Sequence, residues 1–283
     1  MSQSKHAVKV ILVIIDGAGY NACRKECGYL EGLVELGQAE CWKMQTALPS
    51  ISAPLYETIH TGLSPIQHGI TCNEGMRASA FPNVFSAAVA AGLRTAAVGH
   101  SYFFSLYSGY QYDMLRHIEF SDDHSPIQRG RFYSMEAYSK MNICAPAEID
   151  LCAQTLLLAE QHNPDYLLLH TSSVDSIGHA YGGTSREYHR QIYQVDTALS
   201  RTIPLWRDLG YEIMITADHG INEEAHHGGT EAIVREVPFY YIGSASRPAA
   251  DTLLDQRAIA PTILGRMGVP IPDTMTLPAF LGN

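Results

Sequence analysis

The sequence predicts an α/β fold in which a mainly parallel central sheet is flanked by helices. The chain has 283 residues, of which 46% are hydrophobic, and this is enough to fill the core of one large domain. Apolar strand-like runs alternate with amphipathic helical stretches along its length, a pattern typical of a parallel sheet covered by helices. No repeat or low-complexity tract interrupts the pattern. We therefore expect residues 1–283 to form a single domain.

Five apolar runs predict strands, and three amphipathic stretches predict helices. In chain order, the expected strands are Val8–Ile15, Arg94–Val98, Tyr166–His170, Glu212–Thr216 and Val237–Ile242, and the expected helices are Ala145–Gln161, Arg186–Leu205 and Gln256–Met267. Pro54 predicts one more helix, through Leu55 to His60, because proline suits the first helical turn. The aromatic and polar stretch 101–139 has weak periodicity, so we expect an insertion over one face of the sheet. Its aromatic side chains would form a lid, a wall for a ligand, or only packing.

Composition argues against two kinds of partner. The longest apolar run, Val8–Ile15, falls far short of the ~20 residues that span a bilayer. The first residues show no long apolar segment followed by a small-residue cleavage site, so we expect a cytoplasmic protein without a membrane role. The formal charge of −10 argues against a nucleic-acid polymer as partner, because polyanion binding draws on Lys and Arg. A small anionic substrate stays compatible with this charge if metal ions supply the positive field.

Cysteine and histidine usage narrows the chemistry. The six cysteines lack a repeated spacing, which indicates reduced thiols rather than a disulfide framework. The spacing Cys23-x-x-x-Cys27 leaves a metal site there as an alternative. Thirteen histidines accompany 29 acidic residues, and their placement decides whether they are surface residues or ligands.

Candidate metal ligands follow three of the predicted strands. They are Asp16 after Val8–Ile15, Asp175 and His179 after Tyr166–His170, and Asp218 and His219 after Glu212–Thr216. The carboxyl ends of parallel strands meet at one edge of an open sheet, where ligands bind. Carboxylate and neutral imidazole are ligands that zinc takes in proteins. These strand ends therefore predict a metal site.

Local spacing supports this interpretation. One helical turn would put Asp175 and His179 on the same face. Gly220 permits a tight turn that swings both preceding side chains inward. His226 and His227 add an imidazole pair in a glycine-rich loop. Each fragment alone could be a cap, a turn or a surface residue, but together they offer enough ligands for two ions.

Ser52 is the candidate nucleophile. A serine hydroxyl is inert at neutral pH unless a base or a metal lowers its proton affinity. The helix expected after Pro54 would place Ser52 beside a positive helix end, which favours an arriving phosphate. The alternative is that Ser50 or Ser52 only caps that helix.

Together these residues resemble the alkaline phosphatase superfamily and, within it, the type I phosphodiesterase/nucleotide pyrophosphatase family. The resemblance extends from Lys9 to about Ile242, and its motifs are Asp16-Gly17, Pro49-Ser-Ile-Ser52-Ala-Pro54, Thr61-Gly62-Leu63-Ser64-Pro65 and His68-Gly69-Ile70. It implies an alkaline-phosphatase-like fold for one catalytic domain. It also implies two divalent metal ions, expected to be Zn²⁺, and hydrolysis of phosphodiester or pyrophosphate bonds through a covalent phosphoserine-type intermediate.

The resemblance also implies a role for each position. One metal site would take Asp175, His179 and His227, and the other Asp16, Asp218, His219 and the Ser52 oxygen. Asn73 would donate a hydrogen bond to a phosphate oxygen, where the alternative is a turn asparagine. His227 is preferred to His226, because the family's last ligand directly precedes glycine.

Two departures bear on the substrate. Family members commonly carry aromatic residues at the places of Ala53 and His170, where they sandwich a nucleotide base. We therefore expect a small phosphate- or phosphonate-containing substrate and little selectivity among bases. His170 could instead pack quietly at the end of its strand.

Other functions stay open at this point. The same bimetal core serves phosphonate hydrolases and phosphomonoesterases. Ser52-Ala53-Pro54 also begins like the sulfatase motif Cys/Ser-x-Pro-x-Arg, but Tyr56 stands in the arginine place. A non-catalytic metal-binding module is a further alternative, against which the complete set of ligands and Ser52 argue.

Overall fold

The computed structural model describes residues 8–135 and 143–282. Within these ranges the strands are β1 Lys9–Ile15, β2 Glu40–Gln45, β3 Thr95–His100, β4 Glu119–Ser121, β5 Arg129–Tyr133, β6 Tyr166–Thr171, β7 Tyr211–Thr216, β8 Glu236–Ile242 and β9 Leu254–Asp255. The helices are α1 Tyr20–Glu26, α2 Gly28–Glu35, α3 Ser52–Thr61, α4 Pro65–His68, α5 Val84–Ala90, α6 Ser101–Tyr107, α7 Glu148–His162, α8 Ser173–Tyr181, α9 Arg186–Asp208, α10 Ala232–Arg235 and α11 Ile259–Met267.

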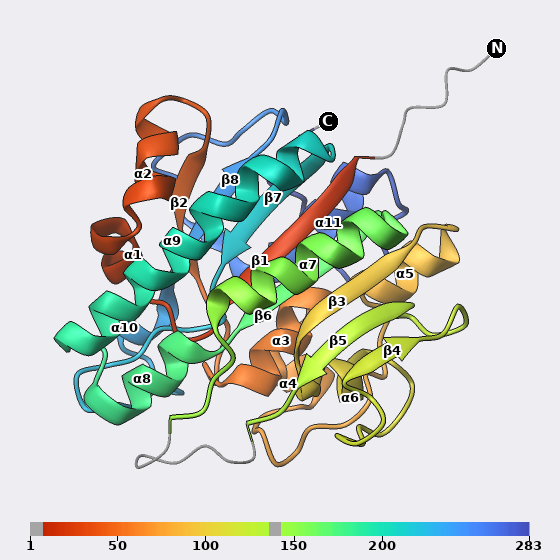
Figure 1. Ribbon diagram of the computed structural model, residues 1–283, viewed down its shortest axis with the longest axis horizontal. Coiled ribbons are helices and arrows are strands. Elements are labelled where there is room, and N and C mark those ends of the chain that lie inside the picture. Colours follow the sequence, from red (N-terminus) through yellow and green to blue (C-terminus); the bar gives the residue numbers. More distant parts are fainter. Residues whose placement is uncertain (1–7, 136–142, 283) are drawn as a thin grey trace.

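The described strands form one mixed sheet in the order β4-β5-β3-β6-β1-β7-β8-β2-β9. The five strands from β5 to β7 in this order run parallel, whereas β8 is antiparallel to β7 and β4 is antiparallel to β5. Figure 1 shows α7 and α9 across the face turned to the viewer, with α3 and α11 behind the sheet. The predicted fold class, a mainly parallel sheet flanked by helices, is confirmed.

Strand β1 lies at the centre of this sheet, between β6 and β7. Its residues from Val10 to Ile14 are fully buried. A strand covered by helices on both faces needs a continuous apolar run rather than an alternating one, and this explains the sequence Lys-Val-Ile-Leu-Val-Ile-Ile. The same reasoning applies to β6 and β7, which are buried along their length. The three strands therefore hold the loops at their carboxyl ends on a rigid base.

Every predicted strand and helix is present, with shifted ends. The predicted strand Val237–Ile242 is β8, but it runs antiparallel. The predicted helix Gln256–Met267 divides into a 3₁₀ turn, Gln256–Ala258, and α11. Helix α3 starts at Ser52, two residues before Pro54. Pro54 remains within the first turn, where its missing N–H breaks no helical hydrogen bond.

The described part of the predicted insertion 101–139 extends the sheet. Strand β5 pairs with β3, and β4 pairs with β5. On α6, Phe103, Phe104 and Tyr107 are buried in the core, so these aromatic side chains serve packing. Residues 136–139 of the predicted insertion lie outside the described residues.

None of the helices in the described ranges combines the length and the apolar character needed to cross a membrane.

All six cysteines lie in the described ranges, and none of them forms a disulfide. Cys23 and Cys27 are both buried. A hydrogen bond with Cys23, together with burial, raises the pKa of Cys27 well above its usual range. The described residues place no third metal-binding side chain with this pair, so the alternative of a cysteine metal site finds no support.

Candidate active site

The candidate ligands meet at one edge of the sheet, where the carboxyl ends of the parallel strands lie (Figure 1). Asp16 directly follows β1, Asp175 and His179 lie on α8 after β6, and Asp218 and His219 follow β7. Ser52 is the first residue of α3, and His227 lies in the loop between β7 and β8. Segments far apart in the sequence thus contribute to a single cluster.

One half of the cluster surrounds the Nε2 atom of His219. This atom lies 3.2 Å from Asp218 Oδ2, 3.6 Å from Asp16 Oδ1 and 3.2 Å from the Ser52 hydroxyl oxygen. Asp218 and His219 are fully buried, and Asp16 and Ser52 are nearly so. The structure therefore brings together the four residues expected at the second metal site.

The other half gathers around Asp175. Its Oδ1 lies 3.4 Å from His179 Nε2 and 3.9 Å from His227 Nε2, and the two Nε2 atoms are 3.1 Å apart. The neighbouring His226 is exposed. The ring of His227 also stacks on His219, with 3.8 Å between centroids.

The two halves share His219. Potential ligand atoms of Asp16, Asp218 and His219 all lie within 4.8 Å of one another, and so do those of Asp175, His219 and His227. His179, expected in the second of these groups, borders it through Asp175 and His227. The sequence could not predict that His219 stands between both groups, because side-chain direction depends on the turn after β7.

Each of the three histidines has its second ring nitrogen on a backbone carbonyl. His179 Nδ1 is 3.0 Å from Ala225 O, His219 Nδ1 is 3.2 Å from Gly220 O, and His227 Nδ1 is 3.1 Å from Ser50 O. A carbonyl oxygen only accepts, so Nδ1 must carry the proton and donate it. The lone pair of each Nε2 is then directed into the cluster, which is the tautomer that binds a metal ion.

Three buried carboxylate oxygens complete the donor set. Asp16 Oδ1, Asp175 Oδ1 and Asp218 Oδ2 have no hydrogen-bond partner within the described residues. A buried oxygen without a partner is costly, and each of these faces a histidine Nε2 that has no proton to donate. A divalent cation between oxygen and nitrogen would satisfy both.

The charges in the cluster also favour the binding of cations. Burial, reinforced by the charge of Asp16, raises the pKa values of Asp175 and Asp218 well above their usual range. Burial and the neighbouring His227 lower the pKa of His219 well below its usual range, so its imidazole is neutral. In the described part of the chain, the ion-pair partners of these carboxylates are histidines, not Lys or Arg. The residues therefore fit two divalent ions.

Backbone contacts hold Ser52 beside these ligands. Ser50, two residues earlier, bridges to Gly228, and its hydroxyl donates to Gly229 O at 3.0 Å. The Asn73 side-chain oxygen accepts the backbone N–H of Ala53, directly after Ser52, at 3.0 Å. Asn73 therefore holds the start of α3 through its side-chain oxygen.

A family model described as type I phosphodiesterase / nucleotide pyrophosphatase matches residues 10–249. The chain belongs to this family. It is thereby a member of the alkaline phosphatase superfamily, as the motifs around Asp16, Ser52 and His68 predicted.

The chain is also similar in sequence to curated proteins. The 2,3-bisphosphoglycerate-independent phosphoglycerate mutase of Natronomonas pharaonis is 35% identical over 121 residues, which cover 40% of this chain and 23% of the mutase. The chain spans about a fifth of the length of the curated relatives that it matches first.

Two solved structures share the fold. Murine ectonucleotide pyrophosphatase/phosphodiesterase 5, an inactive variant in complex with AMP, has a TM-score of 0.70 at 12% identity and covers 94% of this chain and 96% of that one. Phosphonoacetate hydrolase from Sinorhizobium meliloti 1021, in complex with phosphonoformate, has a TM-score of 0.52 at 22% identity and covers 76% of this chain and 56% of that one.

The two departures from the family pattern are both buried. His170 and Ala53 have no exposed surface, so neither lines an open pocket. Of the two interpretations of His170, packing at the strand end agrees with the structure. Its contacts reach Asp16, Tyr56 and Tyr133. Sequence reasoning missed Tyr56 and Tyr133, although the four-residue spacing from Ser52 to Tyr56 was a usable signal.

Gly17 lets the turn after β1, which carries Asp16, approach helix α8, which carries Asp175. It follows Asp16 with φ +78°, a left-handed conformation that favours glycine. A Cβ at this position would lie 2.8 Å from the Cα of Asp175, a backbone atom that cannot move aside easily. The absence of a side chain is therefore what permits Asp16 and Asp175 to sit side by side.

We expect Gly17→Ala to lower both the free energy of unfolding and the metal content of the protein. Gly37→Ala is the matched control, because Gly37 has a similar φ of +69° with open space around it. In the control, the free energy of unfolding should fall only by the cost of placing a side chain in a left-handed conformation, about 1–2 kcal/mol. Chemical denaturation and metal analysis of both variants check this, and equal losses would show that contact with Asp175 is unimportant.

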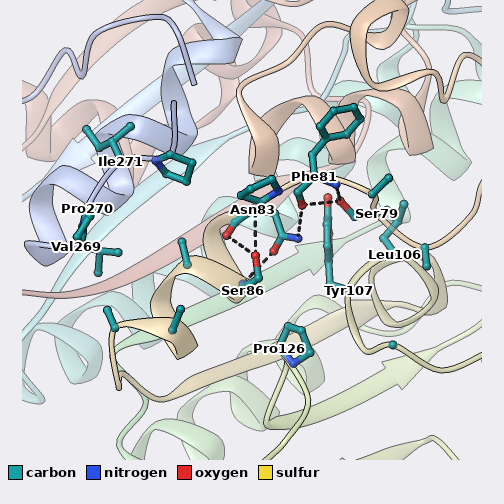
Figure 2. Close-up of a pocket in the computed structure, with 18 residues that line it drawn as sticks. Ser79, Phe81, Asn83, Ser86, Leu106, Tyr107, Pro126, Val269, Pro270 and Ile271 are labelled. Atoms are coloured by element: carbon teal, nitrogen blue, oxygen red, sulfur yellow. Dashed lines mark hydrogen bonds between the residues drawn. The ribbon is translucent and has the colours of Figure 1, made fainter. Parts of the chain in front are cut away.

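A large hollow lies away from this cluster. It has a volume of about 710 Å³ and is lined by α5, the end of α6 and the residues after α11. Figure 2 shows Asn83 and Ser86 in this lining, where each side chain accepts the backbone N–H of the other residue and so caps α5. None of the seven candidate metal ligands lines it. This hollow is therefore separate from the cluster of candidate ligands.

Proposed function

We propose that the chain is a metal-dependent phosphohydrolase that cleaves phosphodiester or pyrophosphate bonds with Ser52 as nucleophile. One observation carries this proposal: three buried carboxylate oxygens without a hydrogen bond to any described residue face unprotonated histidine nitrogens, and the Ser52 hydroxyl lies 3.2 Å from one of these nitrogens. Carboxylate and imidazole donors suit Zn²⁺, which is the expected ion.

The residues would divide between two ions. Asp175, His179 and His227 would hold one, and Asp16, Asp218, His219 and the Ser52 oxygen the other, with His219 close to both. Two divalent ions in such a pair stabilise the entering and the leaving oxygen of an in-line displacement. The neutral histidines keep their Nδ1 protons on backbone carbonyls, which fixes the directions of the ligands.

The reaction would proceed in two displacements. Ser52 Oγ forms a bond to phosphorus while the bond from phosphorus to the leaving oxygen breaks, which leaves a phosphoserine ester. Water then attacks the same phosphorus and releases Ser52 Oγ. Asn73 Nδ2 would donate a hydrogen bond to a non-bridging phosphate oxygen, an interaction worth roughly 10²–10³ in kcat for comparable donors. Its oxygen stays on the Ala53 N–H during this time.

The proposed substrate is small. A formal charge of −10 disfavours a nucleic-acid polymer, and cytoplasmic residence without a membrane role remains part of the proposal. Since Ala53 and His170 are buried, no aromatic wall stands at those two positions, so we expect little selectivity among nucleobases. The AMP complex of the structural neighbour supports a compact phosphate ester as ligand class.

A second candidate is a phosphonate hydrolase or a phosphomonoesterase on the same core. The likeness to phosphonoacetate hydrolase and to the phosphoglycerate mutase favours keeping it. The sulfatase alternative is weaker, because Tyr56 occupies the place of the motif arginine and its hydroxyl is bound to Asp16.

One substrate panel tests the proposal. Hydrolysis of bis(p-nitrophenyl) phosphate, p-nitrophenyl phosphate, phosphonoacetate and a dinucleotide would be compared at one zinc concentration. We expect the diester to react fastest, chelation to remove the activity and added Zn²⁺ to restore it. Full activity after exhaustive chelation would refute metal dependence. Turnover of the phosphonate or the monoester alone would favour the second candidate.

A further inference from the structure

Three polar side chains lie behind Asp16, outside the set of metal ligands. They are Tyr56 on α3, Tyr133 at the end of β5 and His170 on β6. Tyr56 and His170 are buried, with 2% and 0% of their surface exposed. Tyr133 is half-buried. Buried polar side chains such as the other two are costly unless their donors and acceptors are matched.

The hydrogen bonds of the group form a connected chain that ends on one oxygen of Asp16. The Tyr56 hydroxyl donates to Asp16 Oδ2 and lies 2.8 Å from His170 Nε2. His170 Nε2 is 3.2 Å from the same Oδ2. Tyr133 Oη is 2.9 Å from His170 Nδ1. Two groups of the chain thus meet at Oδ2.

The hydrogen bonds at Asp16 have one possible direction. The carboxylate only accepts, so Tyr56 Oη and His170 Nε2 both donate to Asp16 Oδ2. His170 Nδ1 lies beside Tyr133 Oη, and the Tyr133 hydroxyl has two acceptors within reach, this nitrogen at 2.9 Å and the His170 backbone oxygen at 3.3 Å. These hydrogen bonds leave Asp16 Oδ2 saturated, whereas Oδ1 has no hydrogen-bond partner in the described part of the chain and lies 3.6 Å from His219 Nε2.

We propose that Tyr56, His170 and Tyr133 are positioning residues that hold the Asp16 carboxylate so that Oδ1 alone is presented to a metal ion, and that they thereby set the ion affinity of the Asp16 site. This inference rests on the proposed function, since it requires an ion at Asp16. Partners that orient a metal ligand in this way typically contribute 10–100-fold to metal affinity.

Helix α3 couples this arrangement to the nucleophile. Tyr56 follows Ser52 by four residues, so both side chains lie on the same face of the helix. The Tyr56 ring stacks on Phe103 of α6, with 4.5 Å between centroids, and meets His170 edge-on at 5.0 Å. One rigid turn of helix therefore sets the position of the Ser52 oxygen and of the Asp16 carboxylate.

Removal of single hydroxyl groups tests the inference. Zinc binding to the full chain, freed of metal by chelation, would be measured by titration calorimetry for Tyr56→Phe and Tyr133→Phe. Tyr166→Phe is the matched control, because Tyr166 is fully buried and its hydroxyl is 3.0 Å from another buried imidazole nitrogen, His60 Nε2, away from Asp16. Thermal unfolding of all variants would separate stability from affinity.

We expect Tyr56→Phe to weaken one of two zinc-binding events by about 10–100-fold and to leave the other unchanged. Tyr133→Phe, one bond further away, should have a smaller effect in the same direction, and Tyr166→Phe none. Activity that Tyr56→Phe loses at low zinc should return as zinc is raised, which a purely structural defect would not show.

Two outcomes would overturn the inference, and they are distinguishable. If wild type binds two ions and hydrolyses the diester while Tyr56→Phe matches Tyr166→Phe in affinity, the positioning role is refuted and the proposed function stands. If wild type binds no ion that Asp16→Ala removes, both the inference and the two-ion proposal fail.

Discussion

Ser52→Ala is expected to abolish turnover while leaving the fold and most of the metal binding intact. The change deletes the atom that would form the bond to phosphorus, but takes away only one of several ligand atoms around His219. In another hydrolase, losing one member of the nucleophilic set costs kcat roughly 10⁴ to 10⁶-fold. Steady-state kinetics on the chromogenic diester, with metal analysis of the same sample, measure both quantities.

Ser101→Ala is the control for this variant. Ser101 also opens a helix at the carboxyl end of a strand and is 8% exposed, as is Ser52. It lies outside the ligand cluster, so its replacement should leave kcat near the wild-type value. Ser50→Ala should be mild, since it removes one hydrogen bond to the His227 loop. Wild-type rates in Ser52→Ala would show that Ser52 only begins α3 and that the nucleophile lies elsewhere.

Asp218→Asn is expected to lose one metal ion and most of the activity. The asparagine keeps an Oδ1 that accepts the Gly17 N–H, at 3.1 Å in the native chain, so the turn after β7 should persist. The amide nitrogen replaces Oδ2, the oxygen that accepts no hydrogen bond from residues 8–135 and 143–282 and faces His219 Nε2 at 3.2 Å. An amide N–H₂ has no lone pair to offer an ion, so zinc affinity should fall by more than the ~100-fold seen for outer-shell partners.

Metal analysis and calorimetric titration of Asp218→Asn would check this expectation. Asp196→Asn is the control, because Asp196 is equally buried but accepts two backbone N–H groups of α2 far from the cluster. It should bind zinc as wild type does, whatever its stability. Two tightly bound ions in Asp218→Asn would show that Asp218 serves the backbone of the Gly17 turn and not a metal.

Most of the fold could be predicted because the central strands are covered on both faces. In the sequence β1, β6 and β7 are therefore unbroken apolar runs, and the hydrophobic pattern identifies them as strands. Strand β5, which lies near one edge of the sheet between β4 and β3, alternates buried and half-buried residues and contains Gly130 and two arginines, so its sequence pattern is weak. The antiparallel direction of β8 cannot be read from its sequence at all, because apolar runs look alike in either direction.

The candidate site was predictable in its residue types and not in its geometry. Asp16, Asp175 and Asp218 follow strand ends, and that order along the chain is visible in the sequence. The burial of His170 is not visible in the sequence, because it depends on contacts with Tyr56 and Tyr133 from two other elements. The preference for His227 over His226 came only from the resemblance, and the structure adds a physical reason: the carbonyl of Ser50 holds the imidazole of His227, whereas His226 is exposed.

The central position of β1 has a consequence for how the protein is made. On the ribosome this strand is synthesised before both of its neighbours, because β6 begins only at Tyr166 and β7 only at Tyr211. Until then both edges of an apolar strand have no native partner, and pairing between distant segments is slow to form. A nascent chain arrested before Tyr211 would carry Asp16 and Ser52 but no β7 to bring Asp218 and His219 beside them. Metal ions should therefore bind late in biosynthesis. Chaperones that shield apolar segments would have to cover β1 for longer than β6 or β7.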